Sequence, residues 1–256
     1  MAGTPVSAHD CVARAAGAEE AARERRGTGY TVIELKGAGY SYGGDGILGG
    51  VNLRLDGGSF HFLTGPSGAG KTTLLKLCYG ELKPSQGQVD LFGHDSRTID
   101  RDGLARVRQR IGVVHQDCRF LDHLPMAENL SLPLTASGRE SAADADSLRQ
   151  LLAWVGLSHR AHALPPELSG GERQRAALAR AIIMDPEVII ADEPTGNIDW
   201  EMSQRLLTLL AELNRLGKTI LVATHDLALI RAAKSQVAAR VLRLAGGQLQ
   251  LAGSDL

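Results

Sequence analysis

The feature that most restricts the fold of this chain is a glycine-rich segment, GPSGAGKT, at residues 65–72. The residues before it, 59–64 (SFHFLT), have the pattern of a strand, and residues 72–79 (TTLLKLCY) have that of a helix that ends at Gly80. A strand, a turn with the pattern G-x-x-x-x-G-K-T and a helix together form a phosphate-binding loop. The segment therefore predicts an α/β protein that binds a nucleoside triphosphate.

The residue types of this loop suit an anion. Glycines let the backbone curl until several N–H groups face one phosphate, and the helix that starts at Lys71 adds its positive end. Lys71 is expected to reach the β- and γ-phosphates, Thr72 to ligate Mg²⁺ and Thr73 to bond the α-phosphate. A glycine-rich turn without a ligand is the alternative, and the flanking strand and helix disfavour it. The predicted ATP-binding residues here are Gly65, Pro66, Ser67, Gly68, Ala69, Gly70, Lys71, Thr72 and Thr73.

Two carboxylates follow a fully apolar run at residues 188–191 (VIIA). A buried strand there would deliver Asp192 to the edge of a sheet, where it can hold Mg²⁺ through water. Glu193 lies one residue further on, where a carboxylate can polarise an attacking water. Two acidic residues after a strand can instead cap a helix, but the upstream phosphate loop favours the catalytic interpretation.

The order of apolar runs and helices predicts the architecture. The runs at 188–191 and 220–223 are separated by an amphipathic helix at 203–216, which indicates a parallel sheet covered on both faces. Residues 100–168 are more helical and polar and are interrupted by prolines, so they predict a lobe inserted into an α/β core. Four shorter strands are expected from alternating patterns, and the last two of them form a closing hairpin through Gly246 and Gly247. These four strands are 31–35, 51–55, 241–244 and 248–251, and one further strand is expected at 88–92.

Composition excludes several classes of protein. Among 256 residues, 28 basic and 29 acidic side chains give a net charge of -1, so bulk charge does not favour nucleic acid or an anionic membrane. No apolar run approaches the roughly 20 residues that cross a bilayer. Cys11, Cys78 and Cys118 lack metal-ligand spacing, so reduced thiols and no metal cluster are expected. Residues 1–29 hold few large apolar side chains and predict a disordered tail before a domain at 30–256; a short helix at 11–26 is the alternative.

The segment LSGGERQR at residues 168–175 narrows the family. Its serine and glycines open a helix and so predict a second anion cradle. Here the sequence resembles the ATP-binding cassette (ABC) family, and the likeness covers about residues 31–252. The resemblance implies an α/β fold with a P-loop NTPase (RecA-like) core, an antiparallel β subdomain and a helical subdomain inserted at about 117–175. It also implies a homodimer that closes around ATP, in which each signature acts on the ATP of the other subunit through Ser169, Gly170, Gly171 and Glu172.

Further site residues follow from the resemblance, one position at a time. Tyr42 matches the aromatic residue that stacks on adenine, with Tyr40 as the weaker candidate. His225 matches the histidine that contacts the γ-phosphate, and Asp199 matches the aspartate that touches the opposite subunit, although Ile198 replaces the usual leucine. Gln116 matches the glutamine that senses Mg²⁺ and the attacking water. The implied catalytic residues are Glu193, His225 and Gln116, and the implied Mg²⁺ ligands are Thr72, Gln116 and Asp192.

The resemblance also implies a partner. Residues 60–71, 91–95, 116–124 and 212–217 look like the bacterial cell-division branch of the family, which works on an integral membrane protein, FtsX. The chain is then expected in the cytoplasm, on the inner membrane through that partner, and not on nucleic acid. The partner's helix is expected to dock at 117–134. The candidate contacts are Phe120, Leu121, Leu124 and Leu130, which could instead pack the lobe.

Two other functions remain open at this point. ATPases of lipoprotein release or macrolide export share the segment ADEPTGN at residues 191–197. ATPases of DNA repair or chromosome organisation share the same chemistry, but they carry long coiled coils between the two anion cradles. This chain has about 97 residues there and no sustained heptads, which disfavours that class.

Overall fold

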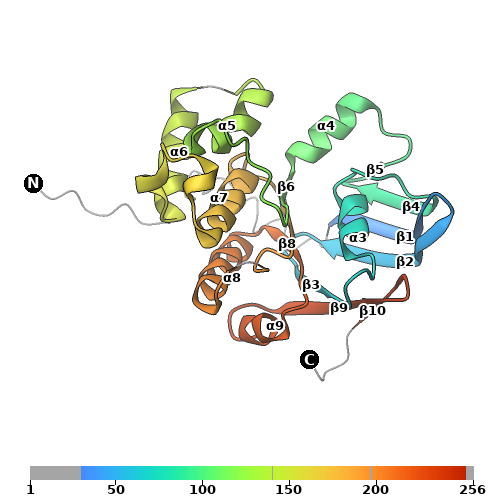
Figure 1. Ribbon diagram of the computed structural model, residues 1–256. Helices are drawn as coiled ribbons and strands as arrows, with labels where there is room; N and C mark the ends of the chain where they lie inside the picture. Colours follow the sequence, from blue (N-terminus) through green and yellow to red (C-terminus); the bar gives the residue numbers. More distant parts are fainter. Residues whose placement is uncertain (1–29, 140, 197, 252–256) are drawn as a thin grey trace, which may run out of the picture.

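A six-stranded sheet lies at the centre of the structure, a computed structural model that describes residues 30–139, 141–196 and 198–251. The strand order is β10-β9-β3-β8-β7-β6 (Figure 1). The neighbours from β9 to β6 pair in parallel, and β10 pairs antiparallel with β9. The strands are β3 (Phe60–Thr64), β6 (Ile111–Val114), β7 (Val188–Asp192), β8 (Thr219–Ala223), β9 (Ala239–Ala245) and β10 (Gln248–Leu251). Parallel neighbours end at one common edge of the sheet.

A second sheet packs beside the first and is antiparallel. Its order is β2-β1-β4-β5, and Figure 1 shows it on the side of α3. The strands are β1 (Thr31–Tyr42), β2 (Asp45–Asp56), β4 (Gln86–Leu91) and β5 (His94–Asp95), and α3 spans Lys71–Cys78.

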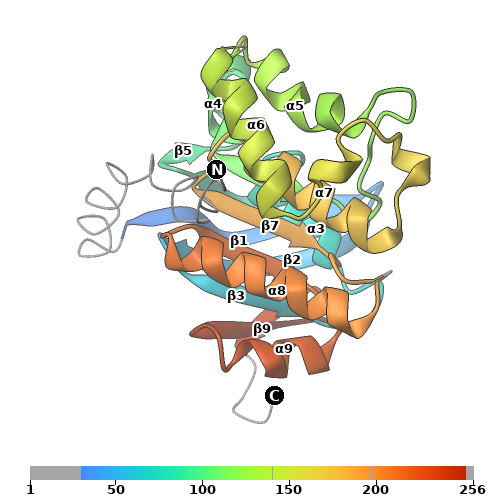
Figure 2. The same ribbon diagram turned by 90° about the vertical axis from the view of Figure 1, so that its left-hand side faces the viewer.

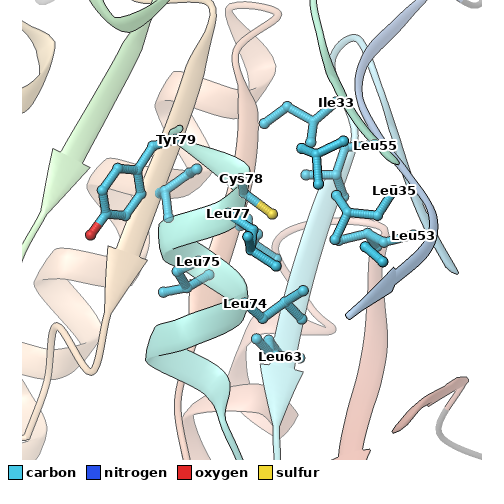
Figure 3. Close-up of a cluster of buried hydrophobic side chains, with 14 of the residues drawn as sticks. Ile33, Leu35, Leu53, Leu55, Leu63, Leu74, Leu75, Leu77, Cys78 and Tyr79 are labelled. Atoms are coloured by element: carbon cyan, nitrogen blue, oxygen red, sulfur yellow. The ribbon is translucent and has the colours of Figure 1, made fainter. Parts of the chain in front are cut away.

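Helix α3 joins the two sheets through its apolar side chains. Leu74, Leu77 and Cys78 are at most 1% exposed and turn toward the strands (Figure 3). They meet side chains from both sheets, namely Leu63, Ile33, Leu35, Leu53 and Leu55. The contact fixes the helix that starts at Lys71 against the strand that ends at Thr64.

The other face of the central sheet is covered by helices as well, with α7 (Gly170–Ile182), α8 (Trp200–Arg215) and α9 (Leu227–Ala233) (Figure 2). Successive residues of β7 point to opposite faces, as the pleat requires. Val188 and Ile190 pack on the α3 side, whereas Ile189 and Ala191 pack with the α7 and α8 side chains. Burial on both faces explains why this strand is apolar throughout.

A helical lobe is inserted between β6 and β7. It contains α5 (Met126–Ala136), α6 (Ala142–Trp154), two short 3-10 turns (Ser158–Arg160 and Pro165–Glu167) and the first part of α7. The lobe has its own buried cluster, in which Met126 and Leu130 pack with Leu152 and Leu168. Helix α4 (Arg101–Gln109) precedes β6 and contacts it.

The fold class expected from the sequence is confirmed, because the parallel core, the antiparallel subdomain and the helical insertion are all present. One strand was not expected: β6 lies inside the stretch 100–168, which the sequence predicts to be more helical and polar than the rest. That strand has four residues, and one of them is Gly112, so its pattern is weak. The glycine is required because a Cβ there would lie 2.2 Å from the carbonyl oxygen of Ala181 in α7.

The remaining expected elements occur with shifted ends. The amphipathic helix begins at Trp200, and the C-terminal hairpin pairs Gln248 with Ala245. The tail at 1–29, including the alternative helix at 11–26 and Cys11, lies outside the described residues. Within the part of the chain that the structure describes, none of the helices has the length and apolar character needed to cross a bilayer.

A buried histidine in β3 generates a pH prediction. His61 is 2% exposed, and within the described part of the chain its Nδ1 has no hydrogen-bond partner. Burial, together with the charge of Arg240, lowers the pKa of His61 from 6.5 to about 4. Between pH 6.5 and about pH 4, His61 is protonated in the unfolded chain but not in the folded chain. The free energy of unfolding therefore falls as the pH drops through this range.

We therefore expect His61→Leu to remove part of the acid sensitivity. Urea unfolding at pH 7.5 and pH 5 should show that the original protein loses about 2 kcal/mol more than the variant does over this interval. Leucine has a similar volume and no titrating group, so the core should stay filled. Equal losses in both proteins would contradict the assignment.

Candidate nucleotide-binding and catalytic site

The phosphate loop connects β3 to α3 and needs glycine at its two ends. Gly65 has φ 154°, and a Cβ there would lie 2.3 Å from the carbonyl oxygen of Leu244 in β9. Gly70 is left-handed at φ 96° and occupies the N-cap of α3, where it offers no side chain to the helix. The first N–H groups of a helix have no partner within the helix. The loop therefore presents free backbone donors to an anion.

Lys71 places its ammonium group directly at this loop. Its Nζ donates to the carbonyl oxygens of Gly65 and Pro66 at 3.0 and 3.3 Å. The same nitrogen lies 3.7 Å from Oε1 of Glu193. The side chain thus brings a positive charge to the place where the loop and the end of β7 meet.

Asp192 ends β7 as a buried and incompletely paired carboxylate. Its Oδ2 accepts a hydrogen bond of 2.7 Å from the Thr72 hydroxyl. Its Oδ1 is buried and has no hydrogen-bond partner among the described residues. Burial raises the pKa of Asp192, although the Thr72 hydrogen bond opposes the rise. A carboxylate oxygen that lacks a donor, beside a threonine hydroxyl, fits a hard divalent cation such as Mg²⁺.

Glu193 is held in a strained position next to His225. Its φ is 45°, which is unfavourable for any residue but glycine, and its N–H donates to the carbonyl oxygen of Ala223 at 2.9 Å. Its Oε2 lies 3.0 Å from Nδ1 of His225 and accepts from the His225 N–H at 3.3 Å. The His225 side chain is 72% exposed. The carboxylate therefore has Lys71 on one oxygen and His225 on the other, with the rest of the imidazole facing outward.

Two predicted residues flank this cluster without contacting it. Gln116 is exposed and follows β6 by two residues; β6 pairs Val114 with Ala191, so Gln116 lies at the same edge of the sheet as Glu193. Tyr42 ends β1 and is 47% exposed, and its ring stacks edge-on against Tyr40 at 4.8 Å. Tyr40 is partly buried against the core. Tyr42 is thus the more accessible of the two rings.

The signature segment forms the start of α7. The Ser169 hydroxyl accepts from the Glu172 N–H, and Oε2 of Glu172 accepts from the Ser169 N–H at 2.8 Å. Glu172 also accepts from Arg160 at 2.9 Å. The Ser169 N–H, with Arg160 as a further cause, lowers the pKa of Glu172 to about 2. The Glu172 carboxylate is therefore occupied within its own chain, where it caps the helix.

The signature and the phosphate loop lie on different parts of the chain. Helix α3 packs on β7, β8 and the antiparallel sheet, whereas α7 packs on β6, α5 and α6 (Figures 1 and 2). Gly170 is exposed, and a Cβ on Gly171 would lie 2.9 Å from the Met202 side chain. The two segments that the sequence predicts to bind anions therefore lie on helices that pack on different elements.

Some functional expectations change with the structure. Asp199 is exposed and its side chain also caps α8 by accepting from the Met202 N–H at 2.9 Å, a role that the sequence reasoning missed. Thr73 is buried.

Among the expected docking contacts Leu130 is fully buried in the lobe and is unavailable, because it faces Met126 and Leu152. Leu121 is 43% exposed, and Phe120 is partly buried.

The chain resembles several known proteins. The family model described as "ABC transporter" matches residues 48–196. The cell division ATP-binding protein FtsE of Haemophilus influenzae is 46% identical over 184 residues, 72% of this chain and 84% of that protein. The lipoprotein-releasing system ATP-binding protein LolD 1 of Rhodopirellula baltica is 44% identical over 185 residues, 72% of this chain and 81% of that protein. A solved dimeric structure of the ATP-binding cassette MJ0796 bound to ADP and Pi, in a post-hydrolysis state, has a TM-score of 0.76 and 31% identity, covering 86% of this chain and 98% of that chain.

The incompletely paired carboxylate generates a stability prediction. Asp192→Asn removes a buried negative charge, so the ligand-free variant should be as stable as the original protein or more stable by about 1 kcal/mol. The same change should abolish the extra stabilisation that ATP with Mg²⁺ gives over ATP with a chelator. Thermal melts under these three conditions measure both effects.

Asp100→Asn is the matched control. Asp100 is the exposed N-cap of α4, and asparagine caps as well as aspartate. This variant should keep the full response to Mg²⁺. A ligand-free Asp192→Asn protein that is less stable by about 2 kcal/mol or more would contradict the assignment.

Proposed function

The chain belongs to the ABC transporter family, and from this membership we propose that it is the ATP-hydrolysing subunit of a membrane complex in bacterial cell division. As a family member it binds and hydrolyses ATP. The observation that carries the assignment of the site is the meeting of Lys71, Asp192, Glu193 and His225 at the ends of three neighbouring strands.

Glu193 is proposed to be the general base. Its carboxylate accepts a proton from water while the water oxygen attacks the γ-phosphorus, and ADP and phosphate are the products. The contact of Oε2 with His225 orients the carboxylate, and His225 is proposed to reach the γ-phosphate with its exposed ring edge. When ATP binds, the Lys71 side chain is proposed to move, so that its ammonium group leaves the carbonyl oxygens of the loop and contacts the β- and γ-phosphates.

The remaining loop and sheet residues are proposed to bind nucleotide and metal. The N–H groups of residues 65–73 receive the phosphates, and Tyr42 stacks on the adenine. Thr72, Asp192 and Gln116 are proposed to hold Mg²⁺, directly or through water. A bound Mg²⁺ would neutralise charge on the phosphate oxygens.

Two copies of the chain are proposed to complete each site. The solved cassette to which this chain is similar is a dimer with ADP and Pi. In this chain the signature and the phosphate loop begin helices that pack on different elements, so we propose that Ser169, Gly170 and Gly171 serve the nucleotide of the second copy. Glu172 would support them from inside the chain, because its carboxylate is already bound. Asp199 is proposed to contact the second copy.

An integral membrane protein resembling FtsX is the proposed partner, and the chain would sit on the cytoplasmic face of the inner membrane through it. A cavity of about 250 Å³ lies beside β6, and His115, the residue before Gln116, is among those that line it. It is lined by Tyr79, Glu81, Arg108, Ile111, Val113 and His115. This cavity and the exposed Leu121 are the proposed docking surface, from which movement of Gln116 would pass to the partner.

Lipoprotein release is the second candidate function, because the LolD relative is nearly as similar as FtsE. The two functions differ in the membrane protein that the chain binds. Mild solubilisation of membranes and mass spectrometry of what co-purifies with the chain should recover an FtsX-like protein. Leu121→Asp should reduce that recovery by tenfold or more, because a buried charge opposes docking, while the ATPase activity of the isolated chain stays intact. Recovery of a lipoprotein-extracting or efflux protein instead would overturn the cell-division role.

A complementation experiment tests the catalytic and the two-chain assignments together. Glu193→Gln should bind ATP but lose at least about 100-fold in turnover, because it lacks a base. Ser169→Asp should keep the helix cap but place an anion in the cradle, so it should also be inactive. An equal mixture should recover about a quarter of the original activity, because half of the dimers are mixed and each of these has one intact site of two.

The outcomes of this mixture are distinct. Ser169→Asn keeps a neutral cap and serves as the control for the added charge. A mixture as inactive as its components would show that the signature does not act across two chains. Full turnover by Glu193→Gln alone would show that another group is the base.

A further inference from the structure

Arg180, near the end of α7, holds the segment that follows β6. Its guanidinium donates to the carbonyl oxygen of Arg119 at 2.8 Å and to that of Cys118. Its Cζ lies 4.5 Å from the centre of the Phe120 ring. One side chain of α7 therefore contacts three consecutive residues of this segment.

The contacts of Arg180 are made without an anion. In the described ranges of the chain, no carboxylate is among the groups that influence Arg180, and burial lowers the pKa of its guanidinium. The two carbonyl oxygens and the Phe120 ring are thus what offsets the partial loss of water around the charge. A side chain bound in this way is specific for the shape of the backbone that it grips.

That backbone is in a conformation that needs support. Cys118 and Arg119 are both left-handed, with φ 56° and 40°. Residues with a Cβ seldom adopt this conformation, and consecutive examples persist only where the surroundings hold them. The carbonyl oxygens that Arg180 binds belong to these same two residues. Two residues further on, the amide of the buried Asn129 holds the Leu121 backbone: its Oδ1 accepts from the Leu121 N–H at 2.8 Å, and its Nδ2 donates to the Leu121 carbonyl oxygen at 3.0 Å.

The segment that Arg180 contacts begins at the last residue of a turn that contains Gln116. The Cys118 N–H donates to the carbonyl oxygen of His115 at 3.0 Å, so residues 115–118 form one turn. β6, which precedes it, is paired with β7 next to Asp192. The shape of the turn consequently decides where Gln116 stands relative to the end of β7. At the other end of α7 lies the Ser169 cap, on the same rigid helix as Arg180.

We propose that Arg180 is a positioning residue that locks the left-handed turn Cys118–Arg119 and so couples the signature helix to the placement of Gln116. The inference rests on the proposed function in one respect, the role of Gln116 at the nucleotide. Arg180 itself touches neither the phosphate loop nor the end of β7. Its effect passes through the backbone of the turn.

The chain has a built-in reporter for this turn. Cys118 is 5% exposed, and Cys78 in α3 is fully buried and serves as an internal reference. Arg180→Met keeps the aliphatic stem and removes the donors. Labelling with a thiol reagent, followed by peptide mass spectrometry, should show that Cys118 reacts about tenfold faster in this variant, because the lost bonds allow the turn to open. Cys78 should react at its original rate, and an unchanged Cys118 rate would overturn the proposal.

A second substitution separates the clamp, meaning the hydrogen bonds of Arg180 to the carbonyl oxygens of Cys118 and Arg119, from general packing. Glycine adopts the left-handed conformation without strain, so Arg119→Gly should make the clamp less necessary. In that background, Arg180→Met should change Cys118 labelling by no more than about threefold. Arg119→Ala removes the same side chain without helping the backbone, and there the tenfold effect should persist. Equal effects in the glycine and alanine backgrounds would mean that Arg180 acts in another way.

Kinetics then test the link to Gln116. Arg180→Met should lower kcat about tenfold and change the KM for ATP by less than about threefold, because the phosphate loop is untouched. In a Gln116→Ala background it should cause no further loss of kcat. Multiplicative losses would overturn the coupling. If Arg180→Met does not fold, Arg180→Lys, which keeps the charge but lacks the planar fork, is measured in the same way.

Failure of the proposed function is distinguishable from failure of this inference. A wild-type chain without ATPase activity, or a Gln116→Ala variant that keeps full activity, would contradict the proposed function. The labelling of Cys118 reports on the clamp in either case, because it needs neither nucleotide nor turnover.

Discussion

The parallel register of β3, β8, β7 and β6 is the constraint on which the rest of the structure depends. Parallel strands end at the same edge, so residues far apart in the chain are delivered side by side without any direct attraction between them. The phosphate loop, Asp192 and Glu193 at the end of β7, and His225 after β8 all lie at this edge for that reason. The turn that carries Gln116 arrives there through β6. Helix α3, held between two sheets by a buried apolar face, then sets the position of Lys71 and Thr72.

The site departs from what stability alone would favour. One carboxylate oxygen of Asp192 is buried with no donor from the residues that the structure describes, and Glu193 is left-handed although it has a side chain. Each feature disfavours the folded state, and each is held by its surroundings: Thr72 binds one oxygen of Asp192, and the Glu193 backbone bonds to β8. Such local conflicts between stability and geometry are typical of sites built for a ligand. The turn at Cys118 and Arg119 belongs to the same class, with Arg180 as its support.

The sequence predicted most of the elements that repeat a strong local pattern. The apolar β7 and β8, the phosphate loop and the C-terminal hairpin were expected where they occur, because burial on two faces or tight turns constrain every residue in them. β6 was not predicted, because it has only four residues and one of them is Gly112. A glycine is needed there because α7 approaches the strand closely. The contact of Arg180 with a turn 61 residues away has no local signal at all. Leu130 and the Glu172 carboxylate show the same limit: an apolar or charged residue can serve either the interior or a partner, and only packing decides which.

The close approach of Gly65 to Leu244 in β9 has a consequence for folding during synthesis on the ribosome. Strand β9, which contains Leu244, is the neighbour of β3 on the side away from β8, and it follows β6, β7 and β8 in the chain, so the ribosome makes it after the other parallel strands. A nascent chain whose phosphate loop has already emerged still has an open edge along β3. That edge can pair wrongly with other extended segments until β9 arrives. Shielding by chaperones is therefore needed until β9 has been made, and premature termination before β9 would leave a product in which β3 is an unprotected edge strand.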